Sequence, residues 1–591
     1  MKNLSLLALA ALAGTSMAQN FKGYQMDFVP ANKTQFKEVK GVMEFTGRMH
    51  ARPNQVVTWQ RMGLTEFGAQ MKREAAVAKI QDIEAGYIEP IDVYIINVPK
   101  GMNENQLAKQ LMKTGLYEYV EPDYMVYPQF TPNDPSLGSQ WSHTNNNSTN
   151  AWDICRGNSA VKIGITDTGV HCGTTGANGH EDLKTRRVLG GNSATATTLA
   201  NVKTEAALGS SIVKDLNGHG THCTGIAAAT GNNGLGIAGV SLEGISHMMC
   251  RVSDSSGGGS SFTALTLGAL YCASQGARVV STSYSGFSQS VIGTTGTTMK
   301  NTYNAVWCYA AGNDGGTYGA AFDWPDVTIV AAIDSGSNLA GFSARGVAID
   351  LSAPGVTIFS TWWASDTVVN TYANLDGTSM ATPYAAGVAS MILAVNPGYT
   401  AQRVQDILYK SCNLQAAGSA STGWGRVNLW NAMGRKANTV TLDTGQVVSG
   451  VVADLWRIEG NELVVKPFIV ANSSIPPVQV VTEHDATVYS ANNYSEIAIM
   501  TKCRLIGASG AMTQNLQIWN FTSGAWENVG SGSVSNTFFE AVKTVNSGNV
   551  TNYISAGKIR SRVQFVPGPL SNANWSIGID QINQRALRAT E

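Results

Sequence analysis

The chain has 591 residues and a mass of 62.5 kDa, which is long for a single domain and predicts about two to four domains. Its net charge is −1, its pI is about 6.7 and only 14% of its residues are charged, so the composition gives no electrostatic basis for binding nucleic acid or an anionic membrane. The neutral composition, with 62 glycines and abundant Ser, Thr and Asn, favours an exported protein.

The N-terminus agrees with export. Lys2 precedes the apolar run 4–13, and the small residues at 16–18 suit a cleavage site, so residues 1–18 are interpreted as a signal peptide and the protein as secreted. The alternative, a membrane anchor, is weaker because an apolar run of about 10 residues is too short to cross a bilayer. We find no other apolar stretch of spanning length in the sequence and expect a soluble mature chain without a membrane span.

Eight cysteines in an exported chain allow up to four disulfides, with 105 possible pairings that the sequence does not distinguish. All but one fall between Cys155 and Cys412, and Cys503 stands alone in the C-terminal part. We therefore expect either one unpaired thiol in the core or one bond across domains.

Residues 19–130 are richer in Lys, Glu and Gln than the rest of the chain. Their apolar spacing predicts, in order, a helix, a strand, a second helix and a second strand, at residues 66–83, 93–98, 104–114 and 117–127. This pattern is typical of a small α+β domain.

Residues 131–434 instead alternate short apolar strands with helices. We predict strands at 161–166, 247–252, 278–283, 305–311 and 327–332, and helices at 219–230, 262–275, 379–395 and 401–411. Continuous apolar strands separated by helices indicate an α/β fold with a doubly wound parallel sheet covered on both faces. Ligands gather at the carboxyl ends of such strands, where Asp167 and Asn313 are placed.

A candidate nucleophile lies in the segment Gly-Thr-Ser-Met-Ala-Thr-Pro at residues 377–383. Ser379 falls at the start of a small-residue apolar run, so we place it in the first turn of a buried helix, near free N–H groups and the positive end of the helix dipole. A serine hydroxyl needs a base and a group that orients the base. His219, in Asn-Gly-His-Gly-Thr-His, and Asp167, in Ile-Thr-Asp-Thr-Gly, supply these residue types.

The chain order Asp, His, Ser within these three motifs resembles the subtilisin-like serine peptidases. The resemblance implies a catalytic triad of Asp167, His219 and Ser379 that hydrolyses peptide bonds in proteins through an acyl-enzyme without a catalytic cofactor. It also implies that Asn313, in Ala-Ala-Gly-Asn, stabilises the oxyanion, and that Cys223 occupies a position where some members keep a buried free thiol. A zinc site has less support, because the possible ligands show no recognised spacing; they are His171, Cys172, His180, His222 and Cys223.

In the same family a peptide substrate pairs with two strands beside the nucleophile. Carried over by position, the substrate-binding residues are Ser283, Tyr284, Ser285, Gly286, Gly257, Gly258 and Gly312. Ser285 departs from the glycine usual at the pocket mouth. No charged residue is placed on the pocket walls, so we expect apolar or aromatic side chains, or little selectivity, before the scissile bond.

The resemblance further implies a structural calcium ion. Its ligands by position are the side chains of Asp134, Asp182 and Asn233 and the carbonyls of Gly231, Leu235 and Ile237. Oxygen ligands on a loop suit calcium. An insertion between Asp167 and Asp182 is a departure from the family pattern.

The resemblance divides the rest of the chain. Residues 19–130 are similar to the family's inhibitory propeptide, which implies a self-processing zymogen cut near 129–131; an ordinary α+β domain that stays attached is the alternative. Residues 131–434 form the catalytic domain, and a linker at 434–438 follows.

Residues 439–591 contain short alternating strands, which predict a β-sandwich, such as a jelly roll, that acts as an accessory domain. We place the strands at 439–442, 447–458, 516–521, 538–544, 560–565 and 576–581. Trp519, Trp526 and Trp575 serve either core packing, the commoner role, or contact with a glycan. Two rival functions remain at this stage: a catalytically silent surface protein and a carbohydrate-binding adhesin.

Overall fold

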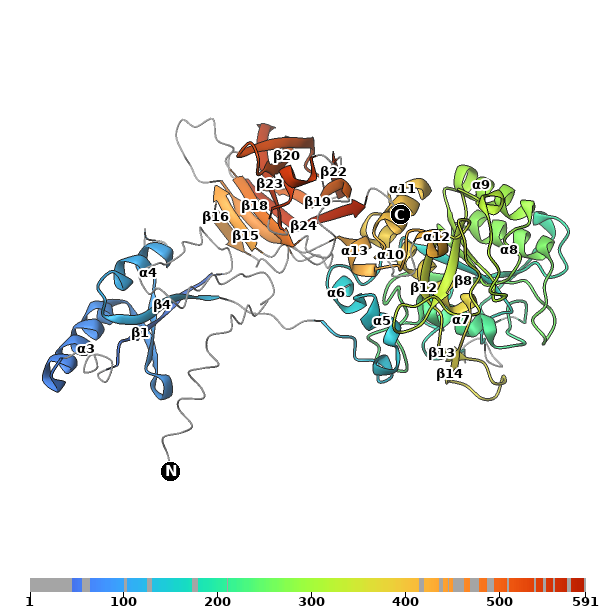
Figure 1. The fold of residues 1–591 in the computed structure, drawn as a ribbon, viewed down its shortest axis with the longest axis horizontal. Helices are drawn as coiled ribbons and strands as arrows, with labels where there is room; N and C mark the ends of the chain where they lie inside the picture. The colour runs from blue at the N-terminus through green and yellow to red at the C-terminus, as the bar shows by residue number, and fades with distance from the viewer. Residues whose placement is uncertain are drawn as a thin grey trace, which may run out of the picture.

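Three units follow one another along the chain in the computed structural model (Figure 1). The structure describes residues 45–55, 64–99, 102, 104–124, 130–172, 179–209, 211–413, 419–434, 439–444, 446–449, 462–467, 478–485, 494–507, 510–535, 538–545, 549–555, 558–570 and 575–588. The predicted signal peptide lies outside the described residues, as does Gln129 of the predicted cleavage segment 129–131.

In the part that the structure describes, the N-terminal unit, residues 45–124, is a four-stranded antiparallel sheet with two α-helices. Its strands run in the order β2-β3-β1-β4. The elements are β1 (Phe45–Pro53), α3 (Glu66–Ile80), β2 (Glu84–Ile88), β3 (Val93–Asn97), α4 (Glu104–Met112) and β4 (Tyr117–Tyr124). Thr65 caps α3 by accepting a hydrogen bond from the Gly68 N–H. Both predicted helices and both predicted strands are present, whereas β1 and β2 were not predicted.

The central unit, residues 130–434, is built on an eight-stranded sheet in the order β12-β11-β10-β9-β5-β8-β6-β7. Every neighbouring pair is parallel except β6 and β7. The strands are β5 (Lys162–Asp167), β6 (Gly191–Asn192), β7 (Lys203–Thr204), β8 (Ser246–Arg251), β9 (Val279–Thr282), β10 (Val306–Ala310), β11 (Thr328–Ile333) and β12 (Leu351–Pro354). The five predicted strands match β5, β8, β9, β10 and β11 to within one residue at each end.

Both faces of this sheet are covered. Side chains alternate along each strand, so Cys308 of β10 joins one hydrophobic cluster while Trp307 and Tyr309 join another. The helices are α7 (His219–Ala228), α8 (Phe262–Ser274), α9 (Ser290–Tyr303), α10 (Thr378–Val395) and α11 (Ala401–Lys410). The first cluster includes residues of α7, α10 and α11, and the second includes residues of α8 and α9. This is the predicted α/β fold, with a doubly wound and largely parallel sheet covered on both faces.

Helix α10 passes through the middle of the unit. Within the described residues it is the one helix with the length and composition to cross a membrane, and 94% of that window is buried inside the protein. It is therefore a core helix.

Among its described residues, the C-terminal unit, residues 439–588, contains two five-stranded sheets, in the orders β15-β18-β23-β20-β21 and β16-β17-β24-β19-β22. The strands are β15 (Thr439–Thr444), β16 (Gln446–Ser449), β17 (Leu463–Lys466), β18 (Val478–Asp485), β19 (Tyr494–Ile506), β20 (Gly510–Asn520), β21 (Ala525–Ser533), β22 (Phe538–Thr544), β23 (Lys558–Leu570) and β24 (Ser576–Arg588). Residues of both sheets contribute to one hydrophobic cluster, which includes Val563 of β23 and Ile577 of β24. Part of the strand predicted at 447–458 lies outside the described residues.

The three tryptophans of this unit differ in environment. Trp575 belongs to the hydrophobic cluster. Trp519 and Trp526 are half-buried, pack edge to face with ring centroids 5.2 Å apart, and lie beneath Arg560. Core packing therefore accounts for Trp575 alone.

A group of charged residues joins the central and C-terminal units, which lie side by side in Figure 1. Arg403 of α11 pairs with Glu496 at 2.8 Å and Glu540 at 2.9 Å, and Arg585 of β24 pairs with Glu540 at 3.2 Å. The Arg585 side chain is fully buried and its Nε donates to the Ala432 carbonyl at 3.0 Å. We call Arg403, Glu496, Glu540 and Arg585 the interdomain charge cluster.

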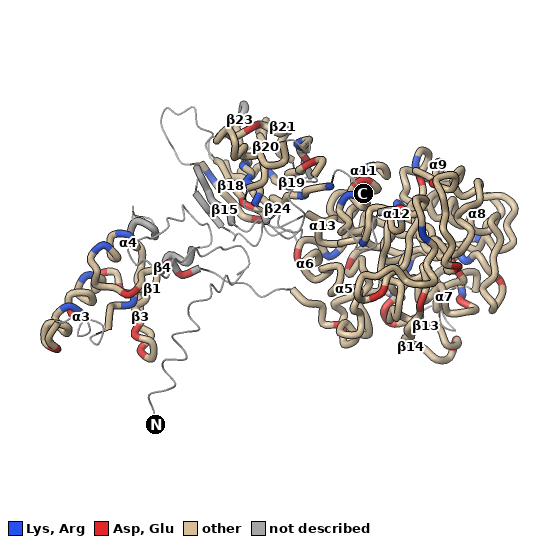
Figure 2. The backbone as a smooth tube through the Cα atoms, in the orientation of Figure 1, with Lys and Arg blue, Asp and Glu red and all other residues tan. Residues whose placement is uncertain are grey.

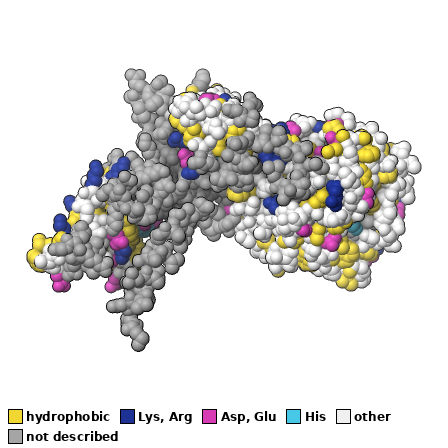
Figure 3. Space-filling model, viewed as in Figure 1, with side chains coloured by type: hydrophobic (Ala, Val, Ile, Leu, Met, Phe, Trp, Pro, Cys, Tyr) yellow, Lys and Arg dark blue, Asp and Glu magenta, His cyan; other side chains and the backbone are white. Residues whose placement is uncertain are grey.

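Beyond this cluster, the end of β24 packs into the central unit. Leu587 belongs to the hydrophobic cluster formed with α7, α10 and α11, and Arg588 donates to the Trp424 carbonyl. Elsewhere, basic and acidic residues are interspersed along the described chain (Figure 2). The visible face of the central unit is mostly uncharged (Figure 3), in keeping with the low charge content.

The eight cysteines are all buried, and the structure joins none of them in a disulfide. The bond across domains considered from the sequence is therefore not formed, since Cys503 lies in the core of the C-terminal unit. Burial raises the pKa of the Cys172 thiol to about 11. A buried, protonated thiol is chemically inert.

Candidate active site

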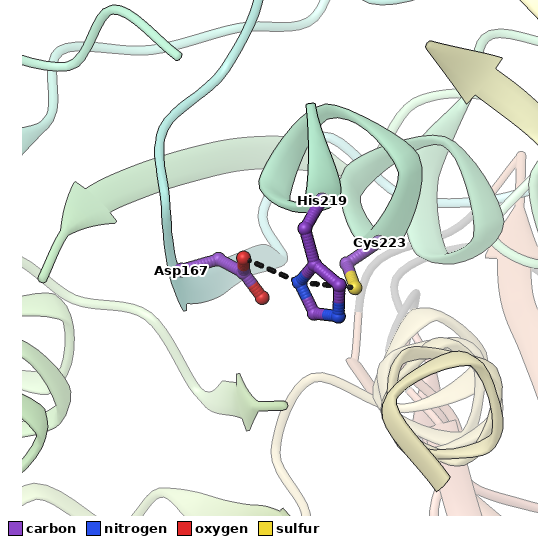
Figure 4. Close-up of side chains that lie close together, drawn as sticks. All are labelled: Asp167, His219 and Cys223. Atoms are coloured by element: carbon purple, nitrogen blue, oxygen red, sulfur yellow. Dashed lines mark hydrogen bonds and ion pairs between the residues drawn. The ribbon is translucent and has the colours of Figure 1, made fainter. Parts of the chain in front are cut away.

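Asp167 and His219 meet at the carboxyl end of the sheet (Figure 4). Asp167 is the last residue of β5 and is fully buried, and His219 is the first residue of α7. The His219 Nδ1 lies 2.7 Å from Asp167 Oδ1, which also accepts the Thr168 N–H at 2.8 Å. Gly220 allows this approach, because a Cβ at that position would lie 2.2 Å from the Gly169 carbonyl oxygen.

The electrostatics of this pair favour a charged imidazole. Burial opposes the protonated ring, but the Asp167 carboxylate outweighs it and raises the pKa of His219 above its usual value. A carboxylate in this position also fixes the tautomer, with the proton on Nδ1 and the lone pair on Nε2.

A buried aspartate that we had not singled out organises the segment before α7. Asp215 is fully buried and accepts hydrogen bonds from the N–H groups of Asn217, Gly218 and Thr221 and from the hydroxyls of Thr168 and Thr221. The Thr168 hydroxyl in turn accepts the Gly220 N–H at 2.8 Å. These contacts tie the end of β5 to the start of α7 and so hold Asp167 beside His219.

Ser379 is the second residue of α10, in the first turn as predicted. Its hydroxyl donates to the Ser283 carbonyl at 3.3 Å. No hydrogen bond joins the side chains of Ser379 and His219, both of which lie within the described residues. Such bonds often tighten only when substrate binds.

Cys223 connects the two candidate residues. It lies one turn after His219 on α7, with Sγ 3.7 Å from His219 Nδ1 (Figure 4), and Sγ donates to the Ser379 carbonyl at 3.3 Å. Burial raises the pKa of this thiol, which keeps it protonated. His219 and Ser379 therefore flank the same buried side chain.

Asn313 follows β10 and is oriented by Thr378. Its Oδ1 accepts the N–H and the hydroxyl of Thr378, both at 2.9 Å, and the Thr378 hydroxyl accepts the Gly312 N–H at 3.2 Å. A Cβ on Gly377 would lie 3.3 Å from Asn313 Nδ2, which places the amide nitrogen next to the residues that precede Ser379. The sequence motifs did not predict this role of Thr378, because Asn313, to which it is hydrogen-bonded, lies 65 residues away.

The two predicted substrate segments lie together. The Tyr284 hydroxyl donates to the Gly258 carbonyl at 2.8 Å, and Asn217 Nδ2 donates to the neighbouring Ser256 carbonyl at 2.7 Å. Gly257 is exposed, and its N–H donates to the Ser255 hydroxyl at 3.1 Å. The segment at 255–258 thus lies between Tyr284 and the loop that precedes His219.

The predicted pocket mouth is formed by small residues. Ser285 is exposed, and its hydroxyl oxygen would lie 3.9 Å from a Cβ on Gly312. Gly286 has φ +92°, and a Cβ there would lie 2.6 Å from the Phe262 ring. The ring of Phe262 is therefore the aromatic surface beside this segment.

The residues assigned to calcium also come together. Asp134 Oδ2 accepts the Asn232 N–H at 2.7 Å, while the Asp182 carboxylate accepts the Ile237 N–H at 3.0 Å and Asn233 Nδ2 at 3.1 Å. Burial raises the pKa of both carboxyls, and the charge of Asp182 adds to the effect on Asp134. Two neighbouring buried carboxylates, whose ionised forms burial disfavours, fit a site for a divalent cation.

The possible zinc ligands do not form a site of their own. Burial lowers the pKa of His222 to about 3, and its Nε2 bonds to the Ala373 carbonyl; the His180 Nε2 bonds to the Thr371 carbonyl. Among the described residues, the one group of three His, Cys, Asp or Glu ligand atoms within 4.8 Å of one another is Asp167, His219 and Cys223. That group is the candidate active site.

Comparisons with known proteins identify the family of the central unit. The subtilase family model matches residues 158–425. Thermitase from Thermoactinomyces vulgaris is 36% identical over 314 residues, which cover 51% of this chain and 99% of thermitase. Subtilisin DY from Bacillus licheniformis is 35% identical over 253 residues, which cover 42% of this chain and 82% of the relative.

One solved structure, from the proteases of Pseudoalteromonas arctica, has 26% sequence identity and a TM-score of 0.43, and covers 51% of this chain and 99% of its own. Thermitase, at 36% identity, is matched over almost its whole length. The chain therefore belongs to the subtilase family and is a serine endopeptidase.

Proposed function

We propose that the enzyme cleaves peptide bonds with the triad Asp167, His219 and Ser379. His219 Nε2 takes the hydroxyl proton of Ser379 as Oγ attacks the carbonyl carbon, and the imidazolium then gives that proton to the leaving amine. Water, deprotonated by His219, hydrolyses the acyl-enzyme and releases Ser379. The observation that carries this proposal is the 2.7 Å contact of His219 with Asp167, next to a thiol that also contacts Ser379.

The same proposal assigns the oxyanion site to Asn313 and the Ser379 N–H. The side-chain oxygen of Asn313 accepts two hydrogen bonds from Thr378, so its Nδ2 is the group that can donate to a developing negative charge. The substrate backbone would pair with the segments that contain Gly257, Gly258 and 283–286, with Gly312 at the pocket. Small residues and Phe262 there support acceptance of apolar or aromatic side chains rather than Lys or Arg.

Labelling by a serine-directed fluorophosphonate, together with casein clearing, tests the proposal. The wild type is expected to be labelled and to clear casein, and Ser379→Ala to do neither. Ser274→Ala is the matched control, since its hydroxyl bonds to a carbonyl within α8, away from the site. A folded wild type that resists labelling and retains a glycan would instead favour the silent or adhesin alternatives.

We also infer a secreted zymogen. Residues 1–18 would direct export, 19–130 would inhibit the enzyme until cut near 129–131, and 131–434 would form the catalytic domain, followed by a β-sandwich accessory domain at 439–591. A halolysin-like extracellular serine protease from Natrialba magadii, 31% identical over 335 residues, and an extracellular protease from Xanthomonas campestris, 30% identical over 349 residues, support export. The Ser379→Ala chain is expected to retain residues 19–130, as measured by intact mass, whereas the wild type loses them.

A structural calcium ion is proposed between Asp134, Asp182 and Asn233, with the carbonyls of Gly231, Leu235 and Ile237. Bound calcium stabilises the folded state by mass action, by about 2.7 kcal/mol when its concentration is 100 times Kd. Adding EGTA is therefore expected to shorten the half-life of thermal inactivation, and excess calcium to restore it. Asp182→Asn should abolish this dependence, and a wild-type half-life unchanged by the chelator would contradict the site.

A further inference from the structure

Helix α10 contains a proline in its second turn. Pro383 is the sixth residue of the helix Thr378–Val395. In an α-helix the N–H of residue i+4 donates to the carbonyl of residue i, so a proline at 383 leaves the Ser379 carbonyl without its helical donor. The carbonyl of the candidate nucleophile must therefore find hydrogen-bond donors outside its own helix.

Two side chains from other elements supply these donors. The Ser283 hydroxyl, directly after β9, donates to the Ser379 carbonyl at 2.9 Å, and the Cys223 thiol donates to it from α7 at 3.3 Å. Ser283 is 5% exposed and Cys223 is fully buried, so water competes little for either bond. A thiol is the weaker donor of the two, and the hydroxyl contact is the shorter.

Ser283 also contacts the side chain of Ser379. Its backbone carbonyl accepts the Ser379 hydroxyl at 3.3 Å, while its own hydroxyl holds the Ser379 carbonyl. One residue thus contacts both the reactive oxygen and the peptide unit that follows it. These contacts restrain rotation of the first turn of α10.

We propose that Ser283 is a positioning residue for the nucleophile, whose hydroxyl replaces the peptide N–H that Pro383 removes. This inference rests on the proposed role of Ser379. The proline supplies no N–H to this carbonyl and the Ser283 hydroxyl holds it instead, so that the Ser379 Oγ and N–H keep a fixed direction toward a bound peptide. Ser283 acts through Ser379 by its side chain, in addition to any pairing of its backbone with substrate.

Replacing Ser283 by valine tests this role, with Ser283→Thr as its near-isosteric partner that keeps a hydroxyl. Loss of one buried hydrogen bond is worth roughly 1.4 kcal/mol, which corresponds to a tenfold change. Ser283→Val and Ser283→Ala are expected to lower kcat and the rate of fluorophosphonate labelling about tenfold with little change in KM. Ser283→Thr is expected to recover most of the rate, and Ser274→Ala to show none of these effects.

A double-mutant cycle with Pro383→Ala identifies the mechanism. Alanine at 383 restores the N–H donor, so Ser283→Ala should cost much less in the Pro383→Ala background than in the wild type. An equal loss in both backgrounds, or a change confined to KM, would overturn the inference. If Pro383→Ala does not fold, equal labelling rates for Ser283→Thr and Ser283→Val would overturn it as well. Failure of the proposed function is distinguishable from these outcomes, because the wild type itself would then resist labelling.

Discussion

Replacing Asp167 by asparagine is expected to lower kcat by about 10⁴-fold. In subtilisin, a member of the same family, loss of the corresponding aspartate costs about 3 × 10⁴ in kcat, so the size is taken from that enzyme. The physical reason is the 2.7 Å contact with His219 Nδ1. An asparagine amide can donate to Nδ1, which moves the imidazole proton to Nε2 and leaves the ring unable to accept the Ser379 proton.

The pH profile of the same variant gives a second readout. Since Asp167 raises the pKa of His219, the neutral base is populated only above that raised pKa, and wild-type activity is expected to increase with pH until the ring is deprotonated. In Asp167→Asn, the acidic limb of the pH profile of kcat/KM should therefore move to lower pH, and the maximum value of kcat/KM should fall.

Steady-state hydrolysis of a chromogenic peptide between pH 5 and 10 measures both effects. Asp326→Asn is a matched control, because Asp326 pairs with Lys300 at 2.8 Å beside α9, away from the active site. Residual activity within tenfold of the wild type, with an unshifted limb, would be inconsistent with the proposed triad.

Glu540→Gln is expected to destabilise the protein by about 3–5 kcal/mol. Glu540 is the member of the interdomain charge cluster that pairs with both Arg403 and Arg585. The variant leaves the fully buried Arg585 without its carboxylate, and an uncompensated buried charge costs an amount of this order. We expect both units to unfold at a lower denaturant concentration, because Arg403 belongs to the central unit and Arg585 to the C-terminal unit.

Denaturant unfolding followed by tryptophan fluorescence measures this loss. Glu483→Gln serves as the control, because Glu483 and Arg560 form a partly exposed pair at 3.7 Å within the C-terminal unit, and such pairs contribute at most about 1 kcal/mol. Equal stability of Glu540→Gln and the wild type would show that the charge cluster does not hold the units together.

The pH dependence of this effect has a defined sign. Burial opposes the ionised form of Glu540, but Arg585 and Arg403 outweigh it and lower the pKa of its carboxyl. Its contribution to stability is therefore complete above the carboxyl's unfolded pKa and is lost as the pH falls through the lower folded pKa. The difference between the wild type and Glu540→Gln should shrink in acid.

The sequence was sufficient for the elements with strong local patterns. Continuous apolar runs predicted β5 and β8 to β11 of the central sheet, because strands buried on both faces have few polar residues. Helix α9 was missed, since it is rich in Thr and contains Gly293 and Gly296, all weak helix formers. Those glycines are explained by tertiary packing: a Cβ on Gly293 would lie 2.5 Å from the Trp324 ring.

The residues of the candidate site also divide into those that a local sequence pattern predicted and those that it did not. Motifs and their order predicted Asp167, His219, Ser379 and Asn313, whereas their supporting residues carry no local signature. Asp215, Thr378 and the side chain of Ser283 act through contacts with residues distant in sequence, which a single sequence does not reveal. The cysteines likewise lie in three hydrophobic clusters, and counting them in the sequence did not indicate that the structure joins none of them in a disulfide.

The position of Leu587 in the central hydrophobic cluster has a consequence for biosynthesis. A ribosome delivers the residues of the proposed triad more than 200 positions before it delivers this leucine, because Ser379 precedes Leu587 by 208 residues. Nascent chains stalled before residue 587 would thus expose an incompletely filled interior. The order of translation therefore delays the filling of this part of the central hydrophobic cluster until the C-terminal unit has also been made.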